Sequence, residues 1–350
     1  MTFPEARGLI DGARSARAFP AAAIEVGRRA GPLWQETFGT LSYDAGAAAV
    51  TLDTIFDLAS LTKVIATTSM VMRAITARRL TLDMRVADLV DEWRGADREP
   101  VEVHHLLSHS SGLPAHARLW NEAAGREAYR AAICALPLER VAGSASVYSD
   151  PGFILLGLLL EDILGVTLDS LIDQLRPAVK GDWGYRPPPE WVPRTAPTEL
   201  DAWRGRILQA EVHDENAAAI GGVAGHAGLF GTVTAVGAFA RLVLEAFKED
   251  TLLGTPVLMR RFASRVDIPN SSRALGWDTM LPTSSCGTLM SPTAIGHTGF
   301  TGTSLWIDHE RDVYVVLLTN RVHPTRQNEA LVALRPRVHD AVLTELGARR

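Results

Sequence analysis

The chain has 350 residues, of which 47% are hydrophobic and 21% are charged, an ordinary globular composition. Its formal net charge of -5 leaves no basic excess for a polyanion, so we set nucleic-acid binding aside. Two cysteines, Cys134 and Cys286, are too few for a disulfide framework and lack zinc or redox spacing, so we expect two reduced thiols.

The length exceeds the size at which one core usually stops growing, which predicts one large domain or two closely packed ones. The first residues include Glu5 and lack the apolar run of a signal peptide, which favours a cytoplasmic location. The longest uncharged apolar run, 153–160, ends at Glu161 and is shorter than the ~20 residues that span a bilayer. We therefore expect no membrane span.

The N-terminal part predicts a hairpin of two strands, 21–26 and 33–41, joined by turn residues at 29–32. A short strand at 55–58 then leads into the segment 60–78, which is apolar on nearly every side. This pattern is typical of a buried central helix.

The middle of the chain predicts helices and loops, and the last third predicts strands again. An irregular segment at 183–197 contains three consecutive prolines, and a loop of that size is usually functional or a covering lid. A helix at 331–346 closes the chain. The predicted helices of the middle are 117–136, 151–164, 168–175 and 233–247, and the predicted late strands are 274–280, 294–298, 303–308 and 313–318.

Strands at both ends with helices between them predict an α/β fold, in which one sheet is built from both termini. We expect residues 1–75 and 265–350 to form a discontinuous sheet subdomain and residues 76–264 a mainly helical one. The active site is then expected at their interface.

Ser60-Leu61-Thr62-Lys63 stands where the short strand meets the buried helix. Residues three apart share a helix face, so Lys63 can reach the Ser60 hydroxyl, and burial lowers the pKa of a lysine enough for it to accept the serine proton. The alternative is a helix N-cap serine with a lysine that extends to the surface.

Two further motifs follow along the chain. Tyr148-Ser149-Asp150 either places a phenol beside Ser60 and a carboxylate beside Lys63, or is only a helix start before Pro151. His297-Thr298-Gly299 ends a strand and either lets a substrate approach the glycine closely or is an ordinary hairpin.

In this order, the three motifs resemble those of the penicillin-recognising serine enzymes: Ser-x-x-Lys, then Tyr-x-Asn or Tyr-Ser-Asp, then Lys/His-Thr-Gly. Further stretches are similar to the class C β-lactamase-like branch, which includes esterases, D-amino peptidases and penicillin-binding proteins. These stretches are 106–114, 222–230 and 297–308.

The resemblance implies a serine β-lactamase-like fold, an antiparallel sheet flanked by terminal helices with a helical region inserted. It implies that Ser60 attacks and that Lys63 and Tyr148 move protons. The oxyanion hole would be the backbone N–H groups of Ser60 and Phe300. Substrate-binding positions would be Asp150, His297, Thr298, Gly299 and Phe300.

No cofactor follows from the resemblance. A metal site built from His213, Asp214, Glu215 and His226 is disfavoured because no His-x-x-x-His spacing supports it. The expected partner is a small-molecule ester, amide or β-lactam substrate, and nothing in the sequence indicates an oligomeric state.

Two departures bear on the substrate. His297 stands where a lysine would hold a substrate carboxylate, and an imidazole with a pKa near ~6.5 is largely neutral above pH ~7. Asp150 replaces an asparagine that can donate a hydrogen bond. Both departures favour a carboxylesterase of short acyl esters. The alternatives are a β-lactamase or D-amino-acid peptidase, and an inactive binding relative.

Overall fold

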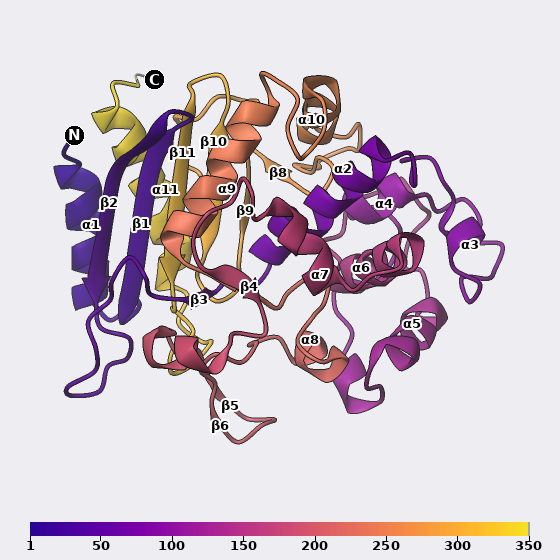
Figure 1. Ribbon diagram of the computed structural model, residues 1–350, viewed down its shortest axis with the longest axis horizontal. Coiled ribbons are helices and arrows are strands. Elements are labelled where there is room, and N and C mark those ends of the chain that lie inside the picture. Colours follow the sequence, from indigo (N-terminus) through magenta and orange to yellow (C-terminus); the bar gives the residue numbers. More distant parts are fainter. Residues whose placement is uncertain (349–350) are drawn as a thin grey trace.

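The computed structural model describes residues 1–348 and is built around a six-stranded antiparallel sheet (Figure 1). The strand order is β2-β1-β11-β10-β9-β8, so strands from both ends of the chain meet in its middle. On β1, Ile24 lies opposite Leu317 and Glu36. The strands are β1 (Ala21–Arg28), β2 (Gly31–Gly39), β8 (Asp278–Thr279), β9 (Ile295–Thr298), β10 (Ser304–Asp308) and β11 (Val313–Thr319).

Helices cover both faces of this sheet, which explains why β11 is buried along its whole length. The terminal helices α1 (Pro4–Ser15) and α11 (Ala330–Glu345) pack against each other and bury one apolar cluster with the sheet. Helix α9 (Val233–Ala246) packs on β1 and β11 from the other face (Figure 1).

Most of the remaining helices lie in the right-hand part of the molecule in Figure 1. A three-stranded sheet of β3 (Phe56–Asp57), β7 (Leu229–Gly231) and β4 (Trp183–Tyr185) lies where this part meets the main sheet. A hairpin of β5 (Leu200–Asp201) and β6 (Arg206–Ile207) projects at the bottom of the view. The helices are η1 (Lys63–Thr68, a π-helix), α2 (Ser69–Thr76), α3 (Val86–Leu89), α4 (Val103–Leu107), η2 (Leu119–Asn121), α5 (Arg126–Ala135), α6 (Asp150–Leu164), α7 (Leu168–Ile172), η3 (Asp173–Leu175), η4 (Pro189–Arg194), α8 (Glu215–Ile220) and α10 (Pro256–Ala263).

The predicted α/β class, the N-terminal hairpin and the closing helix are confirmed, and several predicted elements differ in detail. The predicted helix 117–136 begins only after Gly125, whose φ of 76° interrupts helical geometry. The predicted strand 274–280 shortens to β8, because Gly276 has a φ of 83°. Segment 183–197, predicted to be irregular, contains β4 and η4. The division of the chain at residue 264 stays a prediction, but α9, assigned to the helical part, packs on the sheet.

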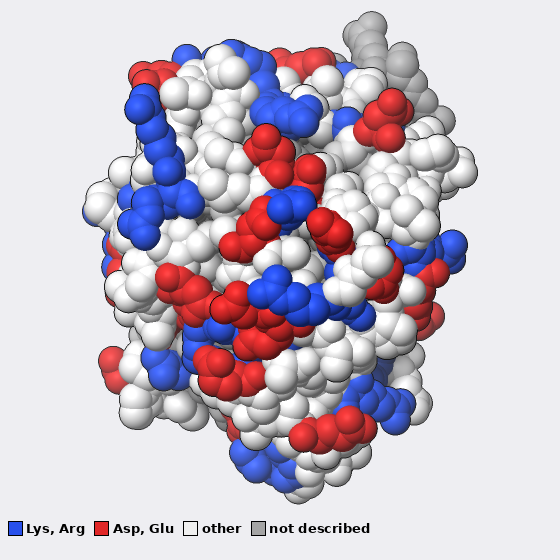
Figure 2. Space-filling view, turned by 90° about the vertical axis from the view of Figure 1, so that its right-hand side faces the viewer, with Lys and Arg blue, Asp and Glu red and all other residues white. Residues whose placement is uncertain are grey.

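Figure 2 shows the face at the right of Figure 1, where acidic and basic side chains are intermixed across the centre. Within residues 1–348, no single helix has the length and apolar character of a membrane span. Helix α6 and the segment 168–175 meet that standard only together, across a bend of 77°.

Helix α6 is held close to the centre of the molecule by a contact between two glycines. A Cβ atom on Gly157 would lie 2.8 Å from the Cα of Gly225, and one on Gly225 would lie 2.1 Å from the carbonyl oxygen of Phe153. The carbonyl of Gly225 also accepts a 2.6 Å hydrogen bond from Thr67 Oγ1 in η1. The two glycines therefore let α6, η1 and the segment at 225 pack together.

This contact predicts opposite effects for two Gly→Ala substitutions in helices. Gly157→Ala should lower the free energy of unfolding by about 1–3 kcal/mol, because the added methyl overpacks the contact with Gly225. Gly8→Ala in α1, where nothing lies within 4 Å of the new Cβ, should raise it by up to about 1 kcal/mol. Urea denaturation of both variants measures this, and a Gly157→Ala variant as stable as wild type would contradict it.

Candidate active site

Ser60 lies on a tight turn between β3 and the π-helix η1. The preceding residue, Ala59, has a φ of 47°, a conformation that costs energy for any residue other than glycine. The Asp57 carboxylate holds the turn, since it accepts hydrogen bonds from the N–H groups of Ala59 at 2.8 Å and His213 at 2.7 Å. Burial raises the pKa of Asp57, and these two N–H donors oppose that effect.

The turn is attached to the loop that follows His297-Thr298-Gly299. Thr301 Oγ1 donates to the carbonyl of Asp57 at 2.7 Å, and Thr303 Oγ1 donates to that of Leu58 at 3.0 Å. A Cβ on Gly299 would lie 2.1 Å from Thr303 Oγ1 and 2.6 Å from the carbonyl oxygen of Leu58. Gly299 is therefore needed because the Ser60 turn of the protein itself lies this close to it. The sequence suggested instead that a substrate approaches the glycine.

Lys63 is fully buried, and its ammonium is surrounded by oxygen atoms. Nζ lies 3.0 Å from Ser60 Oγ, 2.7 Å from Asp150 Oδ1 and 3.3 Å from the carbonyl oxygen of His226. Burial by itself would lower the pKa of Lys63, but the Asp150 carboxylate outweighs it and raises that pKa above its ordinary value. The expected neutral lysine is thus wrong, and Lys63 is an ammonium that donates to Ser60 and Asp150.

Asp150 is free for this pairing because another residue caps its helix. Ser149 Oγ accepts the N–H of Gly152 at 3.2 Å and is the N-cap of α6. The Asp150 carboxylate instead bridges two basic side chains: Lys63 lies at Oδ1, and His116 Nδ1 lies 2.9 Å from Oδ2. Burial opposes ionisation, but Lys63 and His116 hold the pKa of Asp150 well below its usual range. The predicted place of Asp150 beside Lys63 agrees with this geometry.

The Tyr148 ring lies close to Lys63 and to three other polar side chains. Its ring centroid is 4.7 Å from Lys63 Nζ, 5.1 Å from the Arg273 guanidinium carbon, 4.6 Å from the His109 ring and 5.8 Å from the His297 ring. The sequence prediction that Tyr148 lies at the site with Ser60 is therefore consistent with the fold, since both line one cavity.

His297 is a neutral imidazole in this structure. It is buried, its Nδ1 lies 2.8 Å from the carbonyl oxygen of Thr298, and burial together with Arg273 and Lys63 lowers its pKa well below 6.5. The sequence suggested a pKa near the ordinary one, so the imidazole is neutral over a wider pH range than expected. His297 thus supplies no positive charge at neutral pH.

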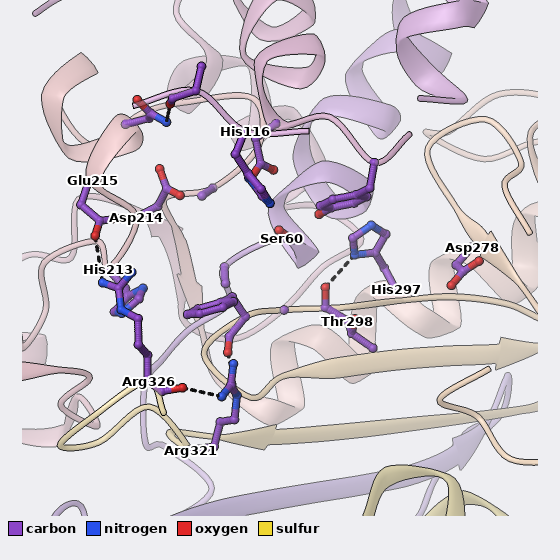
Figure 3. Close-up of a pocket in the computed structure, with 18 of the residues that line it drawn as sticks. Ser60, His116, His213, Asp214, Glu215, Asp278, His297, Thr298, Arg321 and Arg326 are labelled. Atoms are coloured by element: carbon purple, nitrogen blue, oxygen red, sulfur yellow. Dashed lines mark hydrogen bonds and ion pairs between the residues drawn. The ribbon is translucent and has the colours of Figure 1, made fainter. Parts of the chain in front are cut away.

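The pocket beside Ser60 is a cavity of about 710 Å³ (Figure 3). His116 lies on one side of Ser60 in this view, and His297 and Thr298 lie on another. Arg273 also lines the cavity and forms no ion pair with any residue in the described range 1–348. An arginine at this wall supplies the positive charge that His297 lacks.

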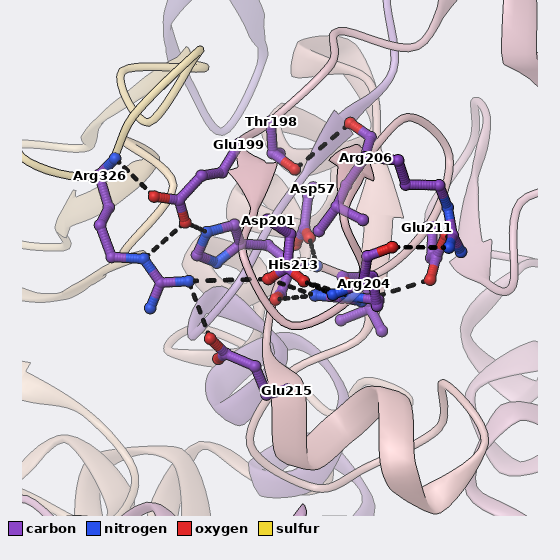
Figure 4. A network of polar contacts seen from close by, with 12 residues as sticks. Asp57, Thr198, Glu199, Asp201, Arg204, Arg206, Glu211, His213, Glu215 and Arg326 are labelled. Atoms are coloured by element: carbon purple, nitrogen blue, oxygen red, sulfur yellow. Dashed lines mark hydrogen bonds and ion pairs between the residues drawn. The ribbon is translucent and has the colours of Figure 1, made fainter.

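Phe300 forms another wall, and its ring stacks on His213, which belongs to the polar network shown in Figure 4. Arg321 Nε donates to the Phe300 carbonyl at 3.0 Å, and the His213 ring stacks on the Phe300 ring at 5.6 Å. His213 Nε2 lies 2.9 Å from Glu199 Oε2, and Arg326 pairs with that same carboxylate at 2.5 Å. The backbone of the loop after Gly299 is therefore held from behind.

Two backbone N–H groups at the pocket remain available to a substrate. Among residues 1–348, the N–H groups of Ser60 and Phe300 donate to no backbone or side-chain acceptor. Both residues line the same cavity. This arrangement is compatible with the predicted oxyanion hole, in which each donor is commonly worth ~3 to 4 kcal/mol.

Sequence reasoning missed three residues of the site: Asp57, His116 and Arg273. His116 follows the segment 106–114, so its position next to a family-like stretch was a signal that was not used. Arg273 stands in no motif, and Asp57 is one acidic residue in a short strand. The two histidines that were considered as metal ligands have different partners. His213 pairs with Glu199, and His226 pairs with Asp214.

The chain is similar to known proteins in sequence and in fold. The sequence model of the Beta-lactamase family matches residues 6–337. A protein of Escherichia coli K12 named "Putative D-alanyl-D-alanine carboxypeptidase" is 30% identical over 323 residues, which cover 78% of this chain and 70% of that protein.

Solved structures share the fold at lower identity. EstCE1, a hydrolase with promiscuous acyltransferase activity, has a TM-score of 0.79 at 18% identity and covers 97% of both chains. The octameric penicillin-binding protein homologue from Pyrococcus abyssi has a TM-score of 0.77 at 20% identity, over 100% of this chain and 78% of that one. The serine β-lactamase-like fold is thus confirmed, and the chain belongs to the Beta-lactamase family of serine hydrolases.

Proposed function

We propose that this hydrolase cleaves small peptide-like amides that end in a free carboxylate, of the D-alanyl peptide class, through an acyl-Ser60 intermediate. The observation that supports this substrate class is the unpaired Arg273 guanidinium on the pocket wall beside Tyr148. Arginine matches a carboxylate with two parallel hydrogen bonds. The name of the Escherichia coli relative also favours this class.

In this proposal Ser60 Oγ attacks the substrate carbonyl, and the N–H groups of Ser60 and Phe300 bind the developing oxyanion. Lys63 is an ammonium, so it stabilises the attacking oxygen by donating to it at 3.0 Å. Tyr148, whose ring adjoins Lys63, is the group that passes the serine proton to the leaving amine. The acyl-serine is then hydrolysed by water.

A carboxylesterase of short acyl esters is the second candidate. The neutral His297 favours it, because this position supplies no cation for a substrate carboxylate. Both Asp150 oxygens are engaged, by Lys63 and His116, so the carboxylate that replaces the family's asparagine is not free to hold an acylamino group. The two candidates differ in whether Arg273 binds a substrate carboxylate, so substitution of Arg273 distinguishes them.

The nucleophile has a direct test. A fluorophosphonate probe should label Ser60, and Ser60→Ala should abolish labelling and lower kcat by about 10³-fold or more, because no covalent intermediate can form. Ser264→Ala, which removes an exposed hydroxyl at the end of α10, should leave both unchanged. Mass spectrometry of the labelled peptide identifies the site. Labelling that survives in Ser60→Ala would refute the assignment.

The substrate class is tested at Arg273 with matched ligands. Wild type should cleave an acetylated D-alanyl-D-alanine peptide with a free carboxylate about 10- to 100-fold better, in kcat/KM, than the same peptide with a carboxamide end. In Arg273→Gln that ratio should fall to about 1. The kcat/KM for p-nitrophenyl acetate should stay near the wild-type value, because this ester has no carboxylate for Arg273 to bind.

Three outcomes would count against the peptide proposal. Equal turnover of the two peptides by wild type would exclude carboxylate recognition. Turnover of p-nitrophenyl esters without turnover of any peptide would favour the carboxylesterase. Faster hydrolysis of nitrocefin than of the peptide would make the chain a β-lactamase.

A further inference from the structure

His116 is a pocket residue to which the proposed function assigns no role. It lies in the loop after α4, and its side chain is 72% exposed, whereas that of its partner Asp150 is 12% exposed. Its Nδ1 lies 2.9 Å from Asp150 Oδ2, and its ring points toward Ser60 in Figure 3. A solvent-accessible imidazole is thus held beside the candidate nucleophile by a buried carboxylate.

The 2.9 Å contact between Nδ1 and the Asp150 carboxylate indicates which nitrogen of His116 can act as a base. An ionised carboxylate only accepts hydrogen bonds, so Nδ1 carries the proton in the neutral ring and Nε2 keeps its lone pair. Asp150 is ionised, because Lys63 and His116 hold its pKa well below the usual range. The same carboxylate-to-imidazole contact orients the general base in other serine hydrolases.

The other basic groups at the pocket are less suited to activate water. Lys63 is an ammonium and has no lone pair. His213 directs Nε2 away from the cavity to Glu199, at 2.9 Å. His297 has a free Nε2, but that atom is buried, and burial lowers its pKa well below 6.5, which makes it a weak base.

We propose that His116 is the general base of deacylation, the step in which water releases the acyl group from Ser60. His116 Nε2 takes a proton from a water molecule as its oxygen attacks the acyl carbon. The bond from that carbon to Ser60 Oγ then breaks, and Oγ takes a proton from the Lys63 ammonium. Transfer from His116 restores the Lys63 proton, and the carboxylic acid product loses its own proton to solvent. The inference rests on the acyl-Ser60 pathway, but not on the substrate class.

Charged neighbours and burial have opposing effects on the pKa of His116. Asp150 contacts it directly and raises its pKa above 6.5, and Asp214 adds to this. Burial and the Lys63 ammonium oppose them. Tyr148, Arg118 and Glu215 are further titratable or charged residues that line the pocket with His116. Because a general base acts when it is neutral, the deacylation rate should rise with pH through a pKa above 6.5 and then level off.

The test separates acylation from deacylation with p-nitrophenyl acetate in stopped flow. His116→Gln should keep the rate of the acylation burst within about threefold of wild type and slow the steady state by about 10²-fold or more. The acetyl-enzyme should then accumulate, visible by intact mass, and the rise of the steady-state rate with pH should be lost. Added imidazole should restore part of the steady-state rate in His116→Ala.

His309→Gln is the matched control, because that histidine stacks on Phe247 and does not line the pocket. It should change neither phase. Equal slowing of burst and steady state in His116→Gln would overturn the proposal, since that pattern means that His116 only positions Asp150 and Lys63. An unchanged steady state, or no acetyl-enzyme in wild type or variant, would overturn it as well. A burst that persists in Ser60→Ala would instead overturn the acyl-Ser60 pathway itself.

Discussion

The buried ion pair between Lys63 and Asp150 is the interaction on which the site depends. A buried ammonium without a partner would be very costly or would lose its charge, so a carboxylate must lie beside it. The pair joins η1, which begins at Lys63, to α6, which begins at Asp150. Because Lys63 also reaches Ser60, any shift between these two helices changes the surroundings of the serine.

The Ser60 turn is a second constraint, and distant parts of the chain maintain it. Ala59 adopts a left-handed conformation that a free chain would leave. Asp57 caps the turn from within, and Thr301 and Thr303 hold it from the strand end. A strained backbone conformation of this kind persists only where several surrounding contacts hold it in place. The main sheet and the helical part must therefore both be folded before the candidate oxyanion donors face one cavity.

The charge of the pocket cannot be inferred from one motif position. His297 in place of lysine suggested a site without a cation for a carboxylate, and the imidazole is indeed neutral. Arg273, which stands 24 positions earlier in the chain, nevertheless brings a guanidinium to the same cavity. Likewise, Asp150 is not an isolated acid that repels ligands, because the Lys63 ammonium and the His116 ring contact its two oxygen atoms.

The sequence by itself determined the class of the protein. Apolar periodicity marked the hairpin and the buried helix, and the order of three motifs identified the family and predicted that Ser60, Lys63 and Tyr148 meet. A local sequence pattern predicts local backbone geometry, and related proteins keep the same order of motifs. The direction of the Lys63 pKa shift, the contact of His116 with Asp150 and the position of Arg273 at the pocket depend on the tertiary structure. A pKa and a pocket's charge depend on burial and on groups that are far apart along the chain, which no local pattern encodes.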